Sequence, residues 1–466
     1  AMTSDDNITW TGTFTPDNNT HDYKNRLRLI EDRYWDIAGN KGPDVYTSYY
    51  VVDTLGPEVS SFSPVNNTCL PVTGNITVTF DGPMVPDYIS TTTPTSLNCA
   101  GSIQVSSDNF SNGSCVVMPG DPVASNSNKT FTLDPVDNLS YDTTYIISVK
   151  TGVNDVYIED ALGNNRSEED NSSFYTSSSP SSVSGIFMAV GSGGKIIRST
   201  DNGSSWVIAN CQFSTDLADV TFGNNTFVAV GSGGKIIRST DNGSTFSTVT
   251  PYDNSNDSMG VTFGNNTFVG VSESGKTGRS TDNGASFSNV NSPRSSTLYG
   301  VTFGNNNFVA VGSSGDIVRS TNNGASWNWN NTISPITTDL RGVTFGNDTF
   351  VAVGSGGKIV RSTDNGTSFD NATNTSSLLY GVTFGNNTFV GVGQNGEIVR
   401  STDNGATWND AISPITTTLF GVTFGNDTFV AVGASGKIVR STDDGSSWDN
   451  STSTITTDLK GVTFSE

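Results

Sequence analysis

Short runs of alternating apolar and polar residues, separated by turn residues, fill the C-terminal part of the chain. A typical run is Gly300-Val301-Thr302-Phe303, which is followed by the turn Gly304-Asn305-Asn306 and by a second run, Phe308-Val309-Ala310-Val311. A third run, Ile317-Val318-Arg319-Ser320, follows another glycine-containing turn. Period-two alternation predicts half-buried strands, and Gly and Asn permit the positive φ of two-residue hairpin loops. The pattern therefore predicts a meander of short antiparallel strands.

A turn with the sequence Ser-Thr-Asp-Asn-Gly-x-x-aromatic ends the third run of each unit, first at residues 199–206. Its Asp can accept hydrogen bonds from nearby backbone N–H groups, its Gly permits positive φ, and its aromatic side chain can be buried beneath the turn. The period of 39 to 42 residues is typical of a solenoid, a propeller or an array. We assign a structural, turn-forming role to the seven equivalent positions, which are Asp201, Asp241, Asp282, Asn322, Asp364, Asp403 and Asp443.

The two ends of the repeat region favour a closed ring over an open array. The first unit begins at Gly185 with a second-strand sequence, whereas the chain ends on Gly461-Val462-Thr463-Phe464, which has a first-strand sequence. Pairing of these segments would complete the first unit, and no polar capping repeats of the kind that an open solenoid needs are apparent. We therefore predict an all-β fold with a seven-bladed β-propeller in residues 185–466, closed by the C-terminal strand.

The repeated unit also resembles a known group of propellers. Its segments Gly-x-Val-Thr-Phe, Phe-Val-Ala-Val-Gly and Gly-Lys-Ile-Val-Arg-Ser-Thr-Asp-x-Gly-x-x-Trp are similar to those of the Asp-box (BNR) propellers. That group includes sialidases, sortilin-type receptors and the photosystem II assembly factor. The resemblance implies the fold of residues 185–466 and leaves the activity open, because one fold hosts many functions.

The N-terminal part of the chain resembles modules of bacterial surface proteins. Residues 7–54 contain short strand-like runs and lead into Asp53-Thr54-Leu55-Gly56-Pro57, as in the second half of bacterial Ig-like repeats of large adhesins. Residues 57–177 resemble the Ig-like domain of S-layer and adhesin proteins, for example in segments 76–84 and 139–149. We expect a partial Ig-like module in residues 1–56, a β-sandwich spacer in residues 57–177 and a Ser-rich linker in residues 178–184.

Charge and hydropathy narrow the classes of partner. The chain of 466 residues has 45 Asp and Glu against 23 Lys and Arg, and its net charge of −22 argues against non-specific binding to nucleic acid. No segment is long and apolar enough to span a bilayer. No signal peptide is visible, and the start within a domain pattern favours a piece excised from a larger protein. The Ig-like modules favour an extracellular or cell-surface location.

The four cysteines lack the spacing of a metal site. Cys99 and Cys115 flank a predicted strand pair, so a disulfide is expected, with two buried free thiols as the alternative. The sequence leaves the roles of Cys69 and Cys211 open.

An acidic loop near the end of the sandwich is a weak candidate for Ca²⁺ binding. The loop contains Asp155, Asp160 and Glu168, and carboxylates are ligands that Ca²⁺ prefers. A solvated acidic loop without a metal is the favoured interpretation. No other cofactor is predicted.

Catalytic residues are scarce in the propeller. The one histidine of the chain, His21, lies outside it, which excludes Ser-His-Asp and Cys-His triads and sites with several histidines. Glycoside hydrolysis needs only two carboxylates, but the arginine cluster of sialidases is not apparent. An arginine recurs at one position of every unit, as at Arg238, and a structural role is favoured there over a ring of functional cations. We expect no enzyme, with a glycosidase as the alternative.

Functional residues are expected where the repeats differ. The residue before the first-strand glycine varies most, and in a propeller it lies at the mouth of the central channel on the face of the long connections. Aromatic and cationic side chains there suit stacking on a sugar or gripping a peptide, whereas incidental loop variation is the alternative. With the nearby Trp329, the candidate ligand-binding residues are Met259, Tyr299, Arg341, Tyr380, Phe420 and Lys460, and Ala218 completes the ring.

These observations favour a non-catalytic fragment of a bacterial surface or secreted adhesin. Ig-like spacers would present a propeller that binds a glycan or a protein on another surface through its variable face. The alternatives are a glycosidase with the Asp-box fold and a structural or assembly module without a small ligand. The oligomeric state is left open.

Overall fold

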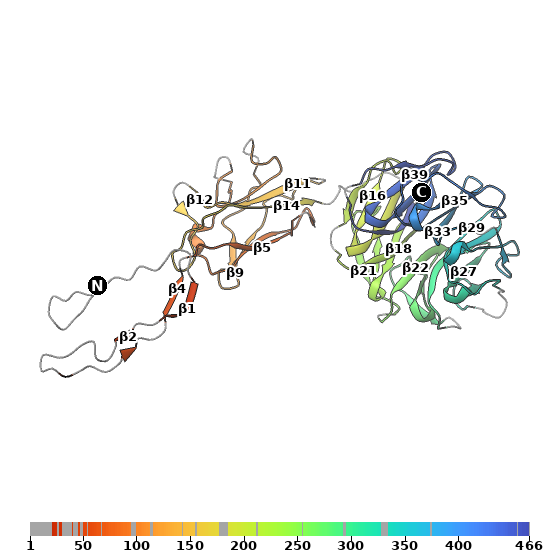
Figure 1. Ribbon diagram of the computed structural model, residues 1–466, viewed down its shortest axis with the longest axis horizontal. Helices are drawn as coiled ribbons and strands as arrows, with labels where there is room; N and C mark the ends of the chain where they lie inside the picture. Colours follow the sequence, from red (N-terminus) through yellow and green to blue (C-terminus); the bar gives the residue numbers. More distant parts are fainter. Residues whose placement is uncertain are drawn as a thin grey trace. The chain divides into compact units, whose positions relative to one another are not determined.

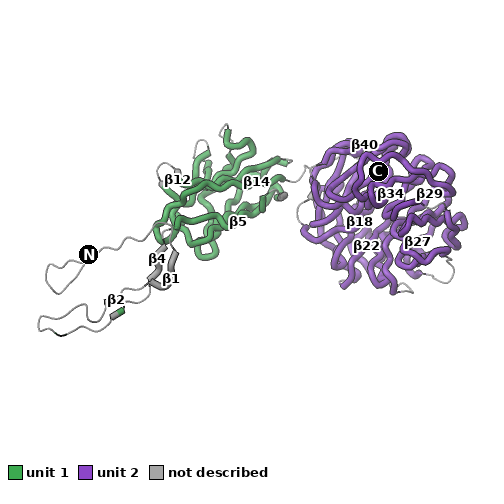
Figure 2. The backbone as a smooth tube through the Cα atoms, viewed as in Figure 1, with its two compact units in different colours: residues 1–176 green, residues 177–466 purple. Residues whose placement is uncertain are grey.

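The computed structural model divides the chain into two compact units, residues 1–176 and 177–466, which are described separately below (Figures 1 and 2). The structure describes residues 21–25, 28–29, 40, 45–46, 50–53, 55–66, 68–94, 99–111, 115–141, 143–153, 156–176, 185–210, 213–253, 255–291, 295–327, 334–372, 375–453 and 455–465.

The first unit is built around two four-stranded sheets. One sheet contains, in spatial order, β5 (Val59–Ser63), β7 (Ile76–Phe80), β10 (Thr130–Leu133) and β9 (Val123–Ser125), all antiparallel. The other contains β6 (Thr68–Leu70), β14 (Asp170–Thr176), β11 (Thr144–Val149) and β8 (Ile103–Ser106), with β6 parallel to β14. Smaller elements are the pair β12 (Gly152–Val153) and β13 (Val156–Tyr157) and the 3₁₀ turn η1 (Pro86–Tyr88).

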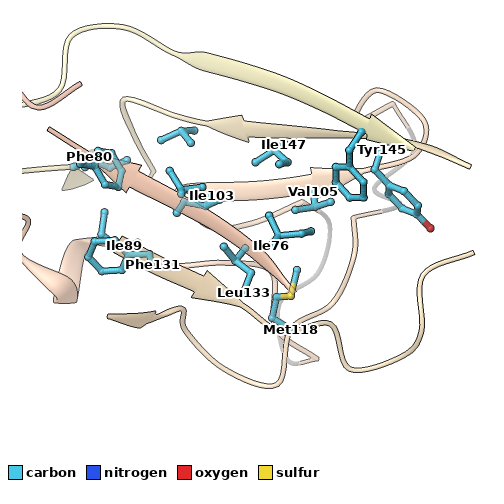
Figure 3. Close-up of a cluster of buried hydrophobic side chains, with 14 of the residues drawn as sticks. Ile76, Phe80, Ile89, Ile103, Val105, Met118, Phe131, Leu133, Tyr145 and Ile147 are labelled. Carbon is cyan, nitrogen blue, oxygen red and sulfur yellow. The ribbon is translucent and has the colours of Figure 1, made fainter. Parts of the chain in front are cut away.

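The inward side chains of these sheets form one apolar core (Figure 3). Ile76, Val78 and Phe80 alternate along β7 with half-buried threonines, and all three are almost fully buried. Phe131 from β10 meets Phe80 edge to face, with the ring centroids 5.9 Å apart. Ile147 contributes to the same core from the opposite sheet. Period-two alternation thus produces the β-sandwich that the sequence predicts for this region.

Residues before the sandwich contribute two short strand pairs. β1 (His21–Asn25) pairs with β4 (Tyr50–Asp53), and β2 (Arg28–Leu29) pairs with β3 (Val45–Tyr46), both antiparallel.

The second unit is a β-propeller. Between residues 185 and 465 the described part of the chain contains seven sheets, six with four strands and one with three. Each innermost strand contacts the innermost strand of the next sheet, and the last of them contacts both the sixth and the first, so the strands form a ring. The innermost strands are β18 (Leu217–Gly223), β22 (Ser258–Gly264), β26 (Leu298–Gly304), β29 (Leu340–Gly346), β33 (Leu379–Gly385), β37 (Leu419–Gly425) and β41 (Leu459–Ser465).

The other strands of each sheet follow in chain order from the axis outward. The second strands are β15 (Ile186–Gly191), β19 (Thr226–Gly231), β23 (Thr267–Ser272), β27 (Asn307–Gly312), β30 (Thr349–Gly354), β34 (Thr388–Gly393) and β38 (Thr428–Gly433). The third strands are β16 (Ile196–Ser199), β20 (Ile236–Ser239), β24 (Lys276–Ser280), β28 (Ile317–Ser320), β31 (Ile359–Ser362), β35 (Ile398–Ser401) and β39 (Ile438–Ser441). The outermost strands are β17 (Val207–Asn210), β21 (Ser247–Val249), β25 (Ser288–Asn291), β32 (Asp370–Asn371), β36 (Asn409–Asp410) and β40 (Asp449–Asn450).

Seven 3₁₀ turns connect the second and third strands. They are η2 (Ser192–Gly194), η3 (Ser232–Gly234), η4 (Glu273–Gly275), η5 (Ser313–Gly315), η6 (Ser355–Gly357), η7 (Gln394–Gly396) and η8 (Ala434–Gly436). Among the residues that the structure describes, no helix is long and apolar enough to cross a membrane.

The C-terminal strand closes the ring, as the repeat pattern predicts. β41 is the innermost strand of the first sheet, in the order β17-β16-β15-β41. It pairs antiparallel with β15, with Ala189 opposite Val462 and Phe187 opposite Phe464. The sheet is therefore assembled from the beginning and the end of the repeat region.

Neighbouring sheets pack through apolar clusters that require close approach at one glycine. Gly304 ends β26 and lies against the ring of Phe345 from the next sheet, where a Cβ atom would lie 2.0 Å from Cγ of that ring. Phe345 in turn contacts Phe350 across its own sheet, with the centroids 4.6 Å apart. This fit explains the Gly that follows Phe in the repeated sequence, because a larger residue would separate the sheets.

The recurrent Ser-Thr-Asp-Asn-Gly turns have the geometry expected of a structural motif. In one of them the Asp403 carboxylate accepts hydrogen bonds from the Thr407 N–H at 2.9 Å and from the Ser401 hydroxyl at 2.7 Å. Asn404 and Gly405 both have positive φ, 62° and 79°. Trp408 lies beneath the turn and donates from Nε1 to the Gly405 carbonyl at 3.1 Å.

The same turns link adjacent blades. Nδ2 of Asn404 donates to the Thr349 hydroxyl of the preceding blade at 2.6 Å. The recurrent arginine also bridges blades, because Nε of Arg238 donates to the Asn283 carbonyl of the next turn at 2.8 Å. Arg279 repeats this contact with the Asn323 carbonyl at 2.7 Å. In these blades the arginine therefore joins the sheets, which agrees with the structural role preferred for it.

Candidate functional site

Seven innermost strands bring the variable residues of the repeats together around the channel mouth. Each of these residues is the second residue of its strand and is half-buried. They line a cavity of about 410 Å³ on the face that also carries the 3₁₀ turns η2 and η3. In order around the ring, which we call the mouth ring, they are Ala218, Met259, Tyr299, Arg341, Tyr380, Phe420 and Lys460.

One side of the mouth ring combines aromatic and cationic side chains that contact one another in pairs. The Arg341 guanidinium lies over the Tyr299 ring, 4.0 Å from its centroid, and Nζ of Lys460 lies 3.7 Å from the centroid of Phe420. Tyr380 meets Phe420 at 70°, with the centroids 5.3 Å apart. Such cation–π and edge-to-face contacts hold these side chains in fixed orientations.

Arg341 and Lys460 each form an ion pair with an aspartate that lies two positions earlier in the sequence, in the connection before the strand. Nη2 of Arg341 lies 3.0 Å from Oδ2 of Asp339, and Nζ of Lys460 lies 3.1 Å from Oδ2 of Asp458. The Asp458 carboxylate also accepts the Ser435 N–H of η8 at 3.0 Å. That hydrogen bond is the largest of the effects that lower the pKa of Asp458, and Lys460 adds to it, so this carboxylate stays charged.

The opposite side of the mouth is smaller and acidic. Ala218 and Met259 stand there, and the cavity widens beside them to reach Asp216 and Asp257. Oδ1 of Asp216 accepts the Gly193 N–H at 2.7 Å, and Oδ1 of Asp257 accepts the Gly233 N–H at 2.8 Å. Each carboxylate is thus fixed on the preceding 3₁₀ turn. The mouth therefore has an aromatic and cationic side and an open acidic side.

Below the mouth ring lies a smaller inner cavity. We call this part of the channel the neck, and the neck position of each innermost strand is the residue directly after its mouth-ring residue. This inner cavity has a volume of about 210 Å³ and shares the mouth-ring residues with the outer one. Glycine occupies the neck position in six innermost strands, and Asp219 occupies it in β18. The Asp219 carboxylate accepts the N–H groups of Val220 at 2.8 Å and Val261 at 2.9 Å.

Burial raises the pKa of Asp219 to about 7, and the hydrogen bonds from Val261 and Val220 oppose this increase. The side chain keeps some exposed surface toward the channel, and protein atoms surround it on its other sides. Asp219 is therefore an acid that titrates near neutral pH inside a narrow cavity.

Sequence comparison of the repeats identified the mouth ring and overlooked the acidic residues around it. Asp219 could have been found from the same comparison, because it interrupts a column of glycines. Asp216 and Asp257 belong to a weaker pattern, an Asp two positions before the mouth-ring residue, which Asp339 and Asp458 repeat. Trp329, the remaining candidate, lies outside the described residues.

Of the Ca²⁺ candidates in the first unit, the structure describes Asp160 and Glu168. Oδ1 of Asp160 accepts the N–H groups of Leu162 and Asn164 at 2.8 and 2.9 Å, so this carboxylate orders its own loop. Glu168 is exposed, and Asp155 lies outside the described residues. Across the part of the chain that the structure describes, no three His, Cys, Asp or Glu side chains gather as a metal site would require.

A disulfide joins Cys99 and Cys115 in the first unit, with the Cα atoms 5.2 Å apart. It connects the segment before β8 to the residue that forms a bridge with Ser106 at the end of that strand. The Cys69 side chain and Cys211 lie outside the described residues.

Comparison with known families matches three parts of the chain. Residues 1–52 and residues 53–176 each match a family described as a bacterial Ig-like domain. Residues 288–420 match the DUF6242 beta propeller domain. No curated protein matches the chain. Bacterial Ig-like domains are typical of extracellular or surface proteins.

Solved structures with similar folds share little sequence with the chain. YCF48 bound to D1 peptide has 19% identity and a TM-score of 0.43, covering 51% of this chain and 80% of that one. YCF48 from Cyanidioschyzon merolae has 18% identity and a TM-score of 0.45, covering 54% and 89%. The nidogen/laminin complex has 12% identity and a TM-score of 0.41, covering 60% and 98%. The family matches show that the chain consists of bacterial Ig-like domains followed by a β-propeller domain.

Proposed function

We propose that this propeller is a non-catalytic binding module of a bacterial surface or secreted adhesin, presented by Ig-like spacers. It binds a glycan or protein ligand on another surface through the channel mouth. The observation that supports this proposal is the mouth ring itself, in which the most variable repeat position places three aromatic and two cationic side chains around one cavity.

The preorganisation of the mouth ring supports a binding role. Arg341 and Lys460 are each held by one carboxylate and one aromatic ring, so little side-chain entropy remains to be lost when a ligand binds. Tyr380 and Phe420 offer apolar surface between the two cations. The cavity thus combines hydrophobic contact with a few oriented polar groups, as ligand sites usually do.

We further propose that the propeller is of the Asp-box class. The repeated turn geometry supports this assignment: an Asp carboxylate receives backbone and hydroxyl donors, an Asn and a Gly have positive φ, and an aromatic residue packs beneath. The class alone specifies no ligand.

The decisive experiment compares ligand capture by the intact chain and by a variant of the mouth. Glycan arrays and pull-downs with bacterial and host surface extracts would be probed with the native chain and with the triple variant Tyr299→Ala, Tyr380→Ala, Phe420→Ala. We expect binding by the native chain and its loss in the variant. Ile412→Ala, at a side chain that is 83% exposed outside the cavity, is the matched control and should bind normally. Unchanged binding by the triple variant would reject the site.

A glycosidase is the second candidate, because Asp216 and Asp257 line the same cavity. Glycoside hydrolysis requires a pair of carboxyl groups on either side of the scissile bond. Assays with chromogenic glycosides test this activity directly. We expect no turnover, and turnover that is lost in both Asp216→Asn and Asp257→Asn would replace the binding proposal with a catalytic one.

A further inference from the structure

The neck of the channel departs from the sevenfold repeat in a single blade. Asp219 in β18 stands where the other innermost strands have glycine, and Ala218 beside it is the smallest residue of the mouth ring. These two departures from the repeat lie next to each other in the channel. Ala218 leaves an opening in the mouth ring, and Asp219 lines the inner cavity directly beyond it.

Close packing fixes the Asp219 side chain in the neck. A Cβ atom added to Gly461 of the adjacent β41 would lie 2.7 Å from Cα of Asp219 and 3.0 Å from its Oδ1. On the other side, Val261 of β22 donates its N–H to Oδ2. Two amide donors therefore orient the carboxylate, and among the described residues no cation forms an ion pair with it.

The charged groups around Asp219 leave it available to a cationic ligand. Lys460 precedes Gly461 in β41, but its Nζ is held by Asp458 and lies over Phe420. Arg341 across the mouth ring is held in the same way by Asp339 and Tyr299. The charged groups on the Ala218 side, Asp216 and Asp257, are both acidic. A cation that enters past Ala218 thus has Asp216 and Asp257 on one side, and on the other side the charge of Lys460 is already paired with Asp458.

We propose that Asp219 determines the specificity of the mouth, and that the ligand presents a protonated primary amine on an unbranched alkyl chain, as a lysine side chain does. This inference rests on the proposed binding function and specifies its ligand as a protein. The methylenes pass Ala218 and contact Met259, and the ammonium group reaches Asp219 in the inner cavity.

The small size of the inner cavity favours an unbranched chain. It has about half the volume of the outer one, 210 against 410 Å³, so we expect it to admit a slender alkyl chain more readily than a substituted sugar ring. An ammonium group has three donors and needs several acceptors. Two of those acceptors are the Asp219 oxygens.

Isothermal titration calorimetry of the full chain with three probes tests the proposal. The probes are Nα-acetyl-lysine amide, Nα-acetyl-norleucine amide, which lacks the amine, and glucosamine, which carries an amine on a sugar ring. We expect binding of the lysine probe, with affinity roughly tenfold or more above that of either other probe. Its affinity should rise from about pH 6 to about pH 8, because the Asp219 carboxylate must be ionised to pair with the ammonium.

Two variants isolate the role of the carboxylate. Asp219→Asn keeps the size of the side chain, and Asp219→Gly restores the residue found at the equivalent position of every other blade, so both should fold. Each is expected to lower the affinity for the lysine probe roughly tenfold or more and to remove its pH dependence. Ile412→Ala, outside the cavity, should leave the affinity for the lysine probe and its pH dependence unchanged.

The outcomes separate this proposal from the proposed function. Absence of lysine-probe binding, equal binding of the norleucine probe, preference for glucosamine, or full affinity in Asp219→Asn would each overturn the assignment of Asp219. If ligand capture in arrays or pull-downs still depended on the three aromatic residues, the binding function would stand with another ligand.

Discussion

The Ile186 N–H donates a hydrogen bond to Oγ of Ser465 at 2.9 Å, and both residues are buried. They lie 279 positions apart in the sequence and belong to the first and last strands of the propeller. Ser465 stands where the preceding six units have a glycine, so the C-terminal strand has a side-chain contact that the repeat does not supply elsewhere. Ring closure therefore includes a contact that is particular to the end of the repeat region.

Disrupting the closing strand should destabilise the whole propeller. Val462 pairs with Ala189 in the first sheet and is 8% exposed, so Val462→Asp would bury a charge without a partner. We expect a cost of roughly 3 kcal/mol or more, seen in calorimetry as a fall in Tm of about 5 °C or more. Val207→Asp, in the outer strand of the same sheet and 41% exposed, is the control. An equal effect of the two changes would argue against closure by β41.

The glycine at the end of the innermost strands that precede β41 should be intolerant of even a methyl group. Gly304→Ala would place Cβ 2.0 Å from Cγ of Phe345, forcing the two sheets apart at a cost of about 1–3 kcal/mol. Thermal denaturation measures this loss. The double variant Gly304→Ala, Phe345→Leu relieves the clash and should recover part of it, whereas additive losses would show that the contact is not the cause.

The recurrent turn should contribute modestly to stability and lose its contribution in acid. Burial alone would raise the pKa of Asp403, but hydrogen bonds from Thr407 and Ser401 together lower it to about 2. A lowered pKa in the folded state means that the contribution is complete above about pH 4 and disappears as the pH falls toward 2. Because the carboxylate is exposed, we expect Asp403→Ala to cost only about 0.5–1 kcal/mol at neutral pH.

One of the seven turns has Asn in place of the recurrent Asp, and it suggests the control for Asp403→Ala. Asn322 occupies the equivalent position, where its Oδ1 accepts the Ser326 N–H at 3.0 Å. Asp403→Asn should therefore retain most of the stability while abolishing the acid dependence of this turn, as followed by denaturant titration at several pH values. A loss as large as that of Asp403→Ala would show that the negative charge itself is required.

The disulfide should stabilise the first unit alone. It closes a loop with a sequence separation of 16, for which chain entropy in the unfolded state is worth about 2–3 kcal/mol. Replacing Cys99 and Cys115 together by Ser should lower the transition of the Ig-like unit and leave that of the propeller unchanged. The two transitions are separable by comparing the full chain with variants such as Val462→Asp, which act on the propeller.

Repetition is what made the propeller and its mouth predictable from sequence. A position that changes between copies of an otherwise constant strand marks a surface that the fold does not constrain, which identified Tyr299, Tyr380 and Phe420. The orientations of Arg341 and Lys460 were not predictable, because each depends on an aromatic ring of the neighbouring blade and on a carboxylate of its own connection.

The acidic side of the mouth was missed for a related reason. Asp216 and Asp257 lie two positions before a mouth-ring residue, at the end of connections whose lengths vary. Their contacts with the N–H groups of Gly193 and Gly233 show that they occupy equivalent places in the structure. Asp219 could be seen in the sequence, because the other six repeats have Gly at the equivalent position. Its position in the neck, however, follows from the ring of strands rather than from any local pattern.

Asp219 should make the propeller less stable as the pH rises from acid to neutral. Its pKa is raised from an ordinary value of 3.8 to about 7 in the folded state, so between these limits the folded protein holds a proton that the unfolded chain has released. The free energy of unfolding therefore falls across this range and levels off above about pH 7. After allowance for water in the channel, the loss should be on the order of 1–2 kcal/mol.

Asp219→Gly removes this titration and restores the residue of the other six blades. Below about pH 4 the variant and the native chain should have similar stability, and above about pH 7 the variant should be the more stable by that amount. Calorimetry at a series of pH values measures the difference. A constant difference at all pH values would mean that Asp219 stays ionised in the folded protein through its two amide donors. A ligand cation paired with Asp219 should offset the cost of burying the ionised carboxylate. The stabilisation by bound Nα-acetyl-lysine amide should therefore be greatest above about pH 7, where the free energy of unfolding of the unliganded protein is lowest.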